Sequence, residues 1–372
     1  MEDHVTYFEN VIDACAECGV CAKIQEQSGC YVRNYADFAR DMLEAIDSKD
    51  FENVTDPAWA CTLCGACTAR CPAHIDAYEF VFRARNVLNP EQPSIVQQFA
   101  PLRTDLESNS FAQLRTIRKP AFPDALEEGS ACEKLFFPGC SLGTYAPELT
   151  AAVFRHLNET EEADGVSYSC CGNPFYFMGD PQLLRQSASA LASKLDSCGV
   201  KQIVTACPSC YAALCSYQRD GILDETLSIT PLPVILADQG MTVSPQAIEN
   251  AGFDTLSIKD ACRDRNDGAF ATSVRQILGN AEVIELKHNR RNSRCCGSGG
   301  LVPLFDPEMS DDKRWLILEE FDNTEASCLV TMCINCSLAL RQDGDTNIMH
   351  YLELLFEQPV DWDALEQDMA KL

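Results

Sequence analysis

A Cys-Cys-Gly triplet that occurs twice, at residues 170–172 and 295–297, constrains the fold of this chain more than any other feature. Each triplet follows a lone cysteine that ends an apolar run, and each precedes a C-x-x-C pair. The cysteines of the first copy are Cys140, Cys170, Cys171, Cys207 and Cys210. Those of the second copy are Cys262, Cys295, Cys296, Cys333 and Cys336. The offsets between copies are 122 (140 to 262), 125 (171 to 296) and 126 (207 to 333), so the sequence predicts an internal repeat that duplicates a metal site.

Both repeats alternate strand-like and helix-like stretches. Short apolar runs predict strands at 135–137, 202–205 and 327–332, and the spacing elsewhere predicts helices at 147–157, 211–218 and 337–341. In such α/β folds, sites gather at the carboxyl ends of parallel strands. This order also puts each C-x-x-C pair at a helix N-terminus, where free amides and the helix dipole favour thiolates.

The first 100 residues carry a different cysteine pattern. It consists of an early run, Cys15, Cys18, Cys21 and Cys30, and a later run, Cys61, Cys64, Cys67 and Cys71, which ends at Pro72. The later run matches the bacterial ferredoxin pattern, in which three cysteines bind one 4Fe–4S cube and the fourth binds the neighbouring cube. We therefore expect one cluster at Cys15, Cys18, Cys21 and Cys71, and another at Cys61, Cys64, Cys67 and Cys30. Cys30 lacks the short spacing and the proline, so a free structural thiol is its alternative. Zinc ribbons use pairs of cysteines, which argues against zinc in this region.

Helical spacing at 35–48 and 76–88 predicts a mostly helical N-terminal module, and the glycines at 19 and 65 are expected where the backbone approaches a cluster closely. Five prolines between 89 and 131 predict an extended connector with a short helix near 110–117. The predicted fold class is α+β multi-domain: a helical ferredoxin-like domain with two 4Fe–4S clusters (1–100), a connector (101–131) and two repeated α/β cysteine-rich domains (132–250 and 251–372).

The doubled cysteines bear on the metal of the repeats. Adjacent cysteines point in divergent directions, so they suit a cluster that accepts sulfur from several sides better than one tetrahedral zinc ion. An iron–sulfur cluster is therefore favoured in each repeat, with zinc in at least one of them and a redox disulfide as alternatives. Four cysteines fall outside every pattern, and we expect them to be small buried hydrophobic side chains: Cys132, Cys198, Cys215 and Cys328.

The composition narrows the setting of the protein. A chain of 372 residues with 22 cysteines has far too many for a reduced intracellular protein unless most are ligands. The first residues lack the pattern of a signal peptide, and no apolar run approaches 18 residues. We therefore expect a cytoplasmic protein with no direct membrane span, associated with a membrane only through a partner subunit. The net charge of −27 argues against nucleic-acid binding.

These motifs resemble those of the heterodisulfide reductase-related iron–sulfur proteins, which join a two-cluster ferredoxin-like module to paired CCG, or cysteine-rich, domains. The resemblance is carried by Phe-Phe-Pro-Gly-Cys-Ser-Leu at 136–142, Ala-Cys-Pro-Ser-Cys at 206–210 and Cys-Cys-Gly-Ser-Gly-Gly at 295–300, and 18 of the 22 cysteines fall on motifs of this family. Similar iron–sulfur subunits occur in glycolate oxidase, lactate utilisation and anaerobic glycerol-3-phosphate dehydrogenase. One departure is Lys-Asp-Ala-Cys-Arg at 259–263, where many members have His-Asp-Pro-Cys.

The resemblance implies cofactors and two classes of function. It implies two cubane 4Fe–4S clusters and one or two noncubane 4Fe–4S clusters in the CCG domains, with zinc in one of them as the alternative. In the first class, cluster-borne chemistry at Cys262, Cys295, Cys296, Cys333 and Cys336 reduces a disulfide or a similar acceptor. In the second class, the chain is a non-catalytic subunit that passes electrons from a flavin dehydrogenase towards quinone or a membrane partner. Intact cysteine sets in both repeats favour the first, in a complex with a flavoprotein, a ferredoxin or a membrane quinone or haem subunit.

A basic stretch precedes the second triplet. In a chain of 56 acids and 29 bases, residues 287–294 contain four cations and no acid, and Arg263 and Arg265 follow Cys262. These cations offset the charge of a thiolate-bound cluster or pair with nearby acids, or some of them bind an anionic group of the substrate through the planar arginine fork. Under the last interpretation, Arg291 and Arg294 are candidate ligands of an acidic substrate.

Overall fold

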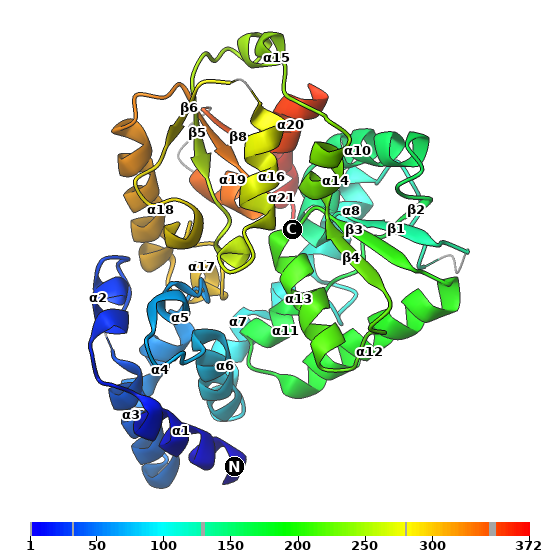
Figure 1. The fold of residues 1–372 in the computed structure, drawn as a ribbon. Coiled ribbons are helices and arrows are strands. Elements are labelled where there is room, and N and C mark those ends of the chain that lie inside the picture. The colour runs from blue at the N-terminus through cyan, green and yellow to red at the C-terminus, as the bar shows by residue number, and fades with distance from the viewer. Residues whose placement is uncertain (1, 32, 128–130, 280, 342–346) are drawn as a thin grey trace.

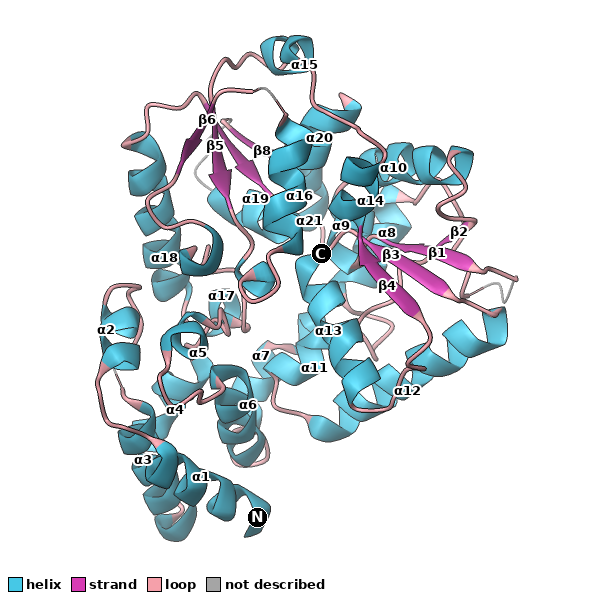
Figure 2. Ribbon diagram, viewed as in Figure 1, coloured by secondary structure: helices cyan, strands magenta, loops and turns pink. Residues whose placement is uncertain are grey.

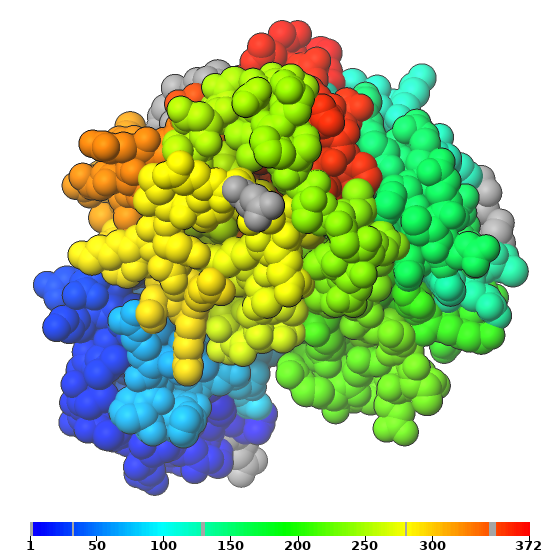
Figure 3. Space-filling model, turned by 45° about the horizontal axis from the view of Figure 1, so that its top comes forward, coloured from blue at the N-terminus to red at the C-terminus, as the bar shows by residue number. Residues whose placement is uncertain are grey.

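The computed structural model describes residues 2–31, 33–127, 131–279, 281–341 and 347–372. A helical N-terminal region packs against two α/β halves (Figures 1 and 2). In Figure 1 this region is blue to cyan, the first repeat is green and the second repeat is yellow to red, and in the space-filling view of Figure 3 the second repeat adjoins both of the others. No helix in the described ranges is long and apolar enough to cross a bilayer.

The N-terminal region is helical, as predicted. Its helices are α1 (Glu2–Ala14), α2 (Val20–Glu26), α3 (Tyr35–Ser48), α4 (Glu52–Trp59), α5 (Ala66–Arg70) and α6 (Ala77–Leu88). The predicted helix at 35–48 coincides with α3, and the one at 76–88 is α6 with Asp76 as its N-cap. Phe80 of α6 packs its ring against Phe8, Tyr35 and Phe38, which ties α1 and α3 to α6.

The connector is more helical than predicted. The helix expected near 110–117 is α8 (Ser110–Arg118), whose cap residue Asn109 accepts a hydrogen bond from the Ala112 amide. The structure adds α7 (Pro93–Gln98) and the 3₁₀ turn η1 (Ala100–Leu102). The sequence interpretation missed them because it treated each proline as a breaker, whereas Pro93 lies in the first turn of α7, where its fixed φ favours a helix start.

The two repeats form separate four-stranded sheets with the same strand order. The first contains β1 (Lys134–Phe137), β2 (Gly165–Val166), β3 (Gln202–Thr205) and β4 (Ser228–Pro231), in the order β2-β1-β3-β4. The second contains β5 (Leu256–Lys259), β6 (Val283–Glu285), β7 (Cys328–Thr331) and β8 (Ile348–His350), in the order β6-β5-β7-β8. All neighbouring strands are parallel. The shared order confirms the internal repeat at the level of the fold.

Helices surround each sheet (Figure 2). In the first repeat they are α9 (Cys140–Tyr145), α10 (Pro147–Glu159), α11 (Asn173–Phe177), α12 (Pro181–Cys198), α13 (Pro208–Arg219) and α14 (Leu232–Asp238), and α15 (Pro245–Asn250) leads into the second repeat. There they are η2 (Cys262–Asp264), α16 (Ala269–Leu278), η3 (Arg290–Asn292), α17 (Val302–Phe305), α18 (Pro307–Asp322), α19 (Ile334–Leu340), α20 (Tyr351–Phe356) and α21 (Trp362–Met369).

One correction concerns the helices that follow the C-x-x-C pairs. They begin three residues earlier than predicted, at Pro208 and Ile334, so each pair straddles a helix start. Cys207 and Cys333 are the N-cap residues, which leaves their partners in the first turn. The two repeats also share one core, which includes Phe136 and Val330 from the two sheets. This shared core holds the two cysteine sets in a fixed relation.

Candidate metal centres and the cavity between them

The structure gathers the first predicted cluster set. Cys15, Cys18, Cys21 and Cys71 line one small enclosed cavity together with Pro72. The early run turns at Gly19, the N-cap residue of α2. Its φ of 70° is a left-handed conformation that glycine adopts without a steric penalty. The crossed set therefore comes together in space across more than 50 residues of chain, and its ligation of a cluster stays a prediction.

The second predicted set also comes together. Burial raises the pKa of Cys61 to about 11, and the charges of Cys30 and Cys64 act on the same thiol. The charges of Cys64, Cys61 and Cys30 likewise act on Cys67. Cys30, whose spacing left its role open, thus lies near its predicted partners, and its ligation of a cluster stays a prediction. A signal that the sequence interpretation missed is Lys313 of α18, whose Nζ lies 2.7 Å from the Cys30 sulfur.

Both five-cysteine sets assemble at the carboxyl ends of the strands. In the first set, the thiols interact closely enough to shift one another's pKa in the pairs Cys140 and Cys170, Cys170 and Cys171, Cys171 and Cys210, and Cys207 and Cys210. In the second set, the corresponding pairs are Cys262 and Cys295, Cys295 and Cys296, Cys296 and Cys336, and Cys333 and Cys336. The Cys336 and Cys296 sulfurs are 3.1 Å apart. We call these groups the first and second cysteine sets.

The donor chemistry of both sets fits an iron–sulfur cluster. Each offers five soft sulfur donors, one more than a tetrahedral ion uses. None of the 22 cysteines, all of which lie in the described ranges, is paired in a disulfide. Among the described residues, no group of three or more His, Cys, Asp or Glu side chains is arranged to hold a single metal ion. Of the four cysteines outside the patterns, Cys132, Cys198 and Cys328 are buried, as expected, whereas Cys215 is partly exposed.

The dicluster region contacts the second cysteine set directly. The side chain of Cys64 interacts with the Cys295 thiol, and this interaction raises the pKa of Cys64. Arg265 Nε donates to the Cys64 carbonyl over 3.2 Å, and its other nitrogens donate to the carbonyls of Arg291 and Ser293. The two metal-binding regions are therefore adjacent at this point, which the sequence did not reveal.

A glycine makes this close approach sterically feasible. Gly300 has a φ of 64°, and a Cβ there would lie 2.2 Å from the Cys61 carbonyl oxygen. We expect Gly300→Ala to lower the stability of the holo-protein by about 1–3 kcal/mol through overpacking, beyond the cost of the backbone conformation. Gly268→Ala is the matched control, because Gly268 has a φ of 75° and nothing within 4 Å. Thermal unfolding of both variants tests this, and equal shifts would contradict it.

A cavity of about 250 Å³ separates the two cysteine sets. Sulfur-bearing residues from both repeats line it, namely Cys140, Cys171, Cys207, Cys210 and Cys333. The charge of Cys207 acts on the Cys333 thiol, so the two C-x-x-C pairs lie close to each other. Much of the remaining wall is apolar, with Leu142, Leu301, Leu304, Ile334 and Leu338. The cavity is therefore open to four cysteines of the first set and to Cys333 of the second.

Two further features border this site. Burial lowers the pKa of His350, which also lines the cavity, to about 3, so this imidazole is neutral. A second cavity of about 370 Å³ reaches Cys140 and Cys170 from another side. Thr104 and Arg115 of the predicted connector form part of its wall, so the connector encloses the first set.

The candidate substrate arginines have protein partners. Arg291 donates to the Ala69 carbonyl over 2.7 Å. Arg294 forms an ion pair with Glu320 at 3.4 Å and donates to His288. Neither lines the cavity between the cysteine sets. Arg294 thus pairs with a nearby acid, as one interpretation expects, whereas Arg291 contacts a carbonyl, and substrate binding by either stays a prediction.

Comparison with known proteins assigns domains to these regions. A model of the CCG cysteine-rich domain matches residues 134–215 and 259–341, and a model of the 4Fe-4S dicluster domain matches residues 11–75. The matches fall inside the domain ranges predicted from the sequence, whose boundaries stay predictions. They indicate 4Fe–4S clusters as the cofactors.

Several curated proteins are similar over most of the chain. One subunit of the fumarate reductase (CoM/CoB) of Methanothermobacter marburgensis is 23% identical over 91% of this chain and 69% of its own length. One subunit of the dihydromethanophenazine:CoB–CoM heterodisulfide reductase of Methanosarcina barkeri is 24% identical over 81% and 76%. EtfAB:quinone oxidoreductase of Syntrophomonas wolfei is 25% identical over 66% of this chain, which spans only 37% of that protein.

Solved structures add little. Aspartate racemase of Picrophilus torridus covers 64% of this chain at 13% identity with a TM-score of 0.31, which supports no statement about fold. The domain matches and the curated relatives agree with the cysteine sets described above. The chain belongs to the heterodisulfide reductase-related iron–sulfur proteins, which combine a 4Fe–4S dicluster domain with two CCG cysteine-rich domains.

Proposed function

We propose that this chain is an iron–sulfur oxidoreductase subunit that carries electrons through two 4Fe–4S cubanes to noncubane clusters in both CCG domains, where a disulfide or a similar acceptor is reduced. The observation that carries the proposal is the cavity between the two cysteine sets, because its wall contains cysteines of both repeats. Reduction of a disulfide takes two electrons and two protons and yields two thiols. When bound, the clusters supply the electrons one at a time, and two sets facing one cavity match that count.

The contact between Cys64 and Cys295 supports a continuous electron route. It joins the predicted ligands of the second cubane to those of the second cysteine set. At the other end of the dicluster domain, Cys18 is exposed to solvent. This exposure gives a flavoprotein, a ferredoxin or a membrane subunit access to the first cubane set. Electrons then travel from Cys18 through the dicluster domain to the cavity.

The residues of the cavity wall bind the acceptor and exclude water. Leu142, Ile334 and Leu338 offer apolar surface to the carbon atoms of a ligand. Ser209 and Asn335 add polar groups close to the two C-x-x-C pairs. An apolar lining also strengthens electrostatic interactions at the sulfur atoms, because it lowers the local dielectric constant.

The alternative is a non-catalytic subunit that passes electrons from a flavin dehydrogenase towards quinone or a membrane partner, with zinc in one CCG domain. The similarity to a protein named EtfAB:quinone oxidoreductase favours this function. The two functions differ in what the cavity does, since only the reductase needs a ligand there.

Blocking the cavity distinguishes them. Leu304 lines the cavity and is 38% exposed, so Leu304→Trp can fill its edge without disturbing the core. We expect this variant to lower the rate at which diethyl disulfide oxidises viologen-reduced holo-protein by about tenfold, which corresponds to roughly 1.4 kcal/mol. Stopped-flow absorbance of the reduced viologen measures this rate under anaerobic conditions.

The matched control is Ile117→Trp. Ile117 is 39% exposed and lies on α8 outside the cavity, so the same added ring is expected to leave the rate unchanged. A wild-type protein that reduces menadione but not the disulfide, with equal menadione rates in both variants, would favour the electron-transfer function instead.

A further inference from the structure

Lys259 is a buried cation beside the second cysteine set. It is the last residue of β5 and is 1% exposed. Its Nζ donates to the Asp260 carbonyl over 2.6 Å and to Ser293 Oγ over 3.1 Å. Both acceptors are neutral, and within the described part of the chain no carboxylate lies within 4.0 Å of this nitrogen. A buried ammonium group without a carboxylate requires another source of negative charge.

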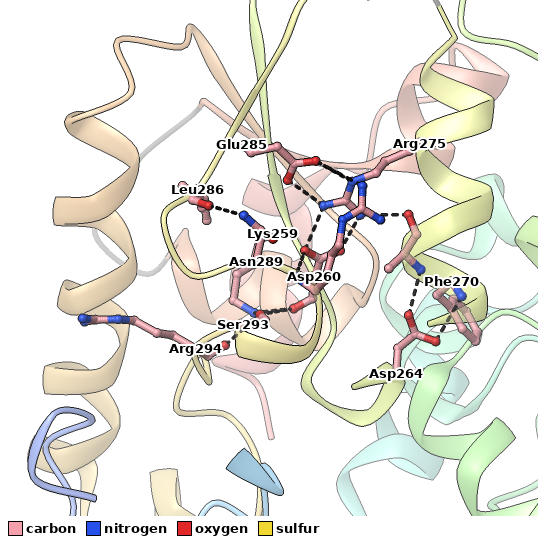
Figure 4. Close-up of polar contacts among 12 residues, drawn as sticks. Lys259, Asp260, Asp264, Phe270, Arg275, Glu285, Leu286, Asn289, Ser293 and Arg294 are labelled. Carbon is pink, nitrogen blue, oxygen red and sulfur yellow. Dashed lines mark hydrogen bonds and ion pairs between the residues drawn. The ribbon is translucent and has the colours of Figure 1, made fainter. Parts of the chain in front are cut away.

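The carboxylate of the next residue in the chain, Asp260, is already neutralised. Asp260 accepts two hydrogen bonds from Arg275, at 2.7 and 3.0 Å, and a third from the Arg290 amide at 2.6 Å. Glu285 shares the same arginine (Figure 4). The ammonium group of Lys259 instead lies beside the second set, because Ser293, which accepts from its Nζ, stands two residues before Cys295. Its charge acts on Cys262, Cys295, Cys296 and Cys336.

The repeat offers an internal comparison. β5 lies between β6 and β7 as β1 lies between β2 and β3, and Lys259 is opposite Thr331 as Phe137 is opposite Thr205. Each stands three residues before the first cysteine of its set. The first repeat therefore has a fully buried phenylalanine in the place of the lysine. The two cysteine sets therefore lie in the same fold, but only the second has a buried positive charge at this strand position.

Other cations lie around the second set in greater number than around the first. The charge of Lys313, which is 2% exposed, acts on Cys295 and Cys64 as well as on Cys30. Arg265 acts on Cys64 at the contact with the second set. At the first set, a cationic influence on Cys207 comes from Arg263, which belongs to the second repeat.

We propose that Lys259 is a positioning residue for charge, which makes the cluster of the second cysteine set the more readily reduced of the two CCG clusters. Reduction adds one negative charge to a buried site, and a fixed cation nearby stabilises that added charge. Net charge and hydrogen bonding around the sulfurs are among the factors that set cluster potentials. The step transfers one electron and makes or breaks no bond. Lys259 keeps its proton throughout.

This inference rests on the electron route proposed above, in which the electron arrives from the cubane at Cys64. It adds an order to that route. The cluster held by the second set would be reduced first and would retain the electron, and the cluster of the first set would be reduced next. The acceptor in the cavity therefore faces one electron-rich side and one electron-poor side until the second electron arrives.

The experiment is a mediated redox titration of the full-length holo-protein, followed by EPR. We expect Lys259→Met to shift the midpoint potential of one CCG signal to a more negative value, with the cubane potentials and the iron content unchanged. Lys259→Arg restores the charge and is expected to restore most of the potential. Lys201→Met, which removes an exposed lysine of the first repeat, is the control and leaves all potentials unchanged.

Two results would overturn the proposal. One is an unchanged CCG potential in Lys259→Met at full iron content, or an equal shift of every signal. The other comes from two cysteine variants, Cys296→Ser and Cys171→Ser, each of which identifies one CCG signal by removing it. The proposal fails if the signal lost in Cys171→Ser has the higher midpoint potential. It also fails if Cys171→Ser loses no signal. Because no acceptor is present, absence of disulfide reductase activity would reject the proposed function without affecting these potentials.

Discussion

Replacing Arg85 by methionine is expected to lower the stability of the protein by about 3 kcal/mol or more. Its guanidinium group is fully buried and donates to four carbonyl oxygens, those of Ala58, Trp59, Cys61 and Phe177, at 2.7–3.1 Å. Each acceptor left without its donor costs roughly 1–3 kcal/mol. Burial lowers the pKa of Arg85 to about 10, which still leaves it charged at neutral pH.

The position of Arg85 explains why this loss spreads beyond one helix. Three of its acceptors, Ala58, Trp59 and Cys61, lie at or just before the start of the later cysteine run. The fourth, Phe177, is the last residue of α11 in the first repeat. Gly179 packs directly on the Arg85 backbone, and Asn86 donates to its carbonyl over 3.0 Å. Arg85 therefore stabilises the contact between the dicluster domain and the first CCG domain. Its removal is expected to destabilise both this interface and the predicted cluster site of Cys61, Cys64, Cys67 and Cys30.

Arg83→Met is the control on the same helix. Arg83 is partly exposed and pairs with Asp3 and Glu79, so its loss is expected to cost less than about 1 kcal/mol. Thermal unfolding of the holo-proteins, with iron content measured before heating, compares the two. A similar midpoint for both variants would show that the buried carbonyls find other donors.

Replacing Cys71 by alanine is expected to remove the cluster of Cys15, Cys18 and Cys21, with a loss of about four iron atoms per chain. The cavity that holds these four residues shows why the effect lies far away in sequence. The cluster of Cys61, Cys64 and Cys67 is expected to remain, although these residues are nearer to the substitution in the chain. Iron determination and EPR of the full-length, anaerobically purified protein measure both.

Cys215→Ala is the control for this loss, because Cys215 lies outside all four sets and is partly exposed on α13. It is expected to keep the full iron content and all EPR signals. Loss of the Cys61-associated signal in Cys71→Ala, with the other signal intact, would show that the two runs do not exchange their fourth ligands.

Much of the local structure followed from the sequence. Periodic apolar residues predicted α3 and α6 closely, since one face of each helix is buried. The cysteine spacing predicted the repeat, which the two sheets of equal strand order confirm. The errors at α7, α13 and α19 all involve helix starts, where a proline or a capping cysteine decides the first turn over only two or three residues.

The sequence alone therefore determined which cysteines belong to one pattern, because ligand spacing and helical or strand periodicity are local properties of the chain. Tertiary structure alone decided how the four sets face one another. Three features depend on segments that are far apart in the chain and share no local pattern. They are the contact of Cys64 with Cys295, the cavity between Cys207 and Cys333, and the burial of Lys259. The cavity arises because the two repeats share one core, and the contact of Cys64 with Cys295 arises because the dicluster region packs on Arg265 and Gly300 of the second repeat.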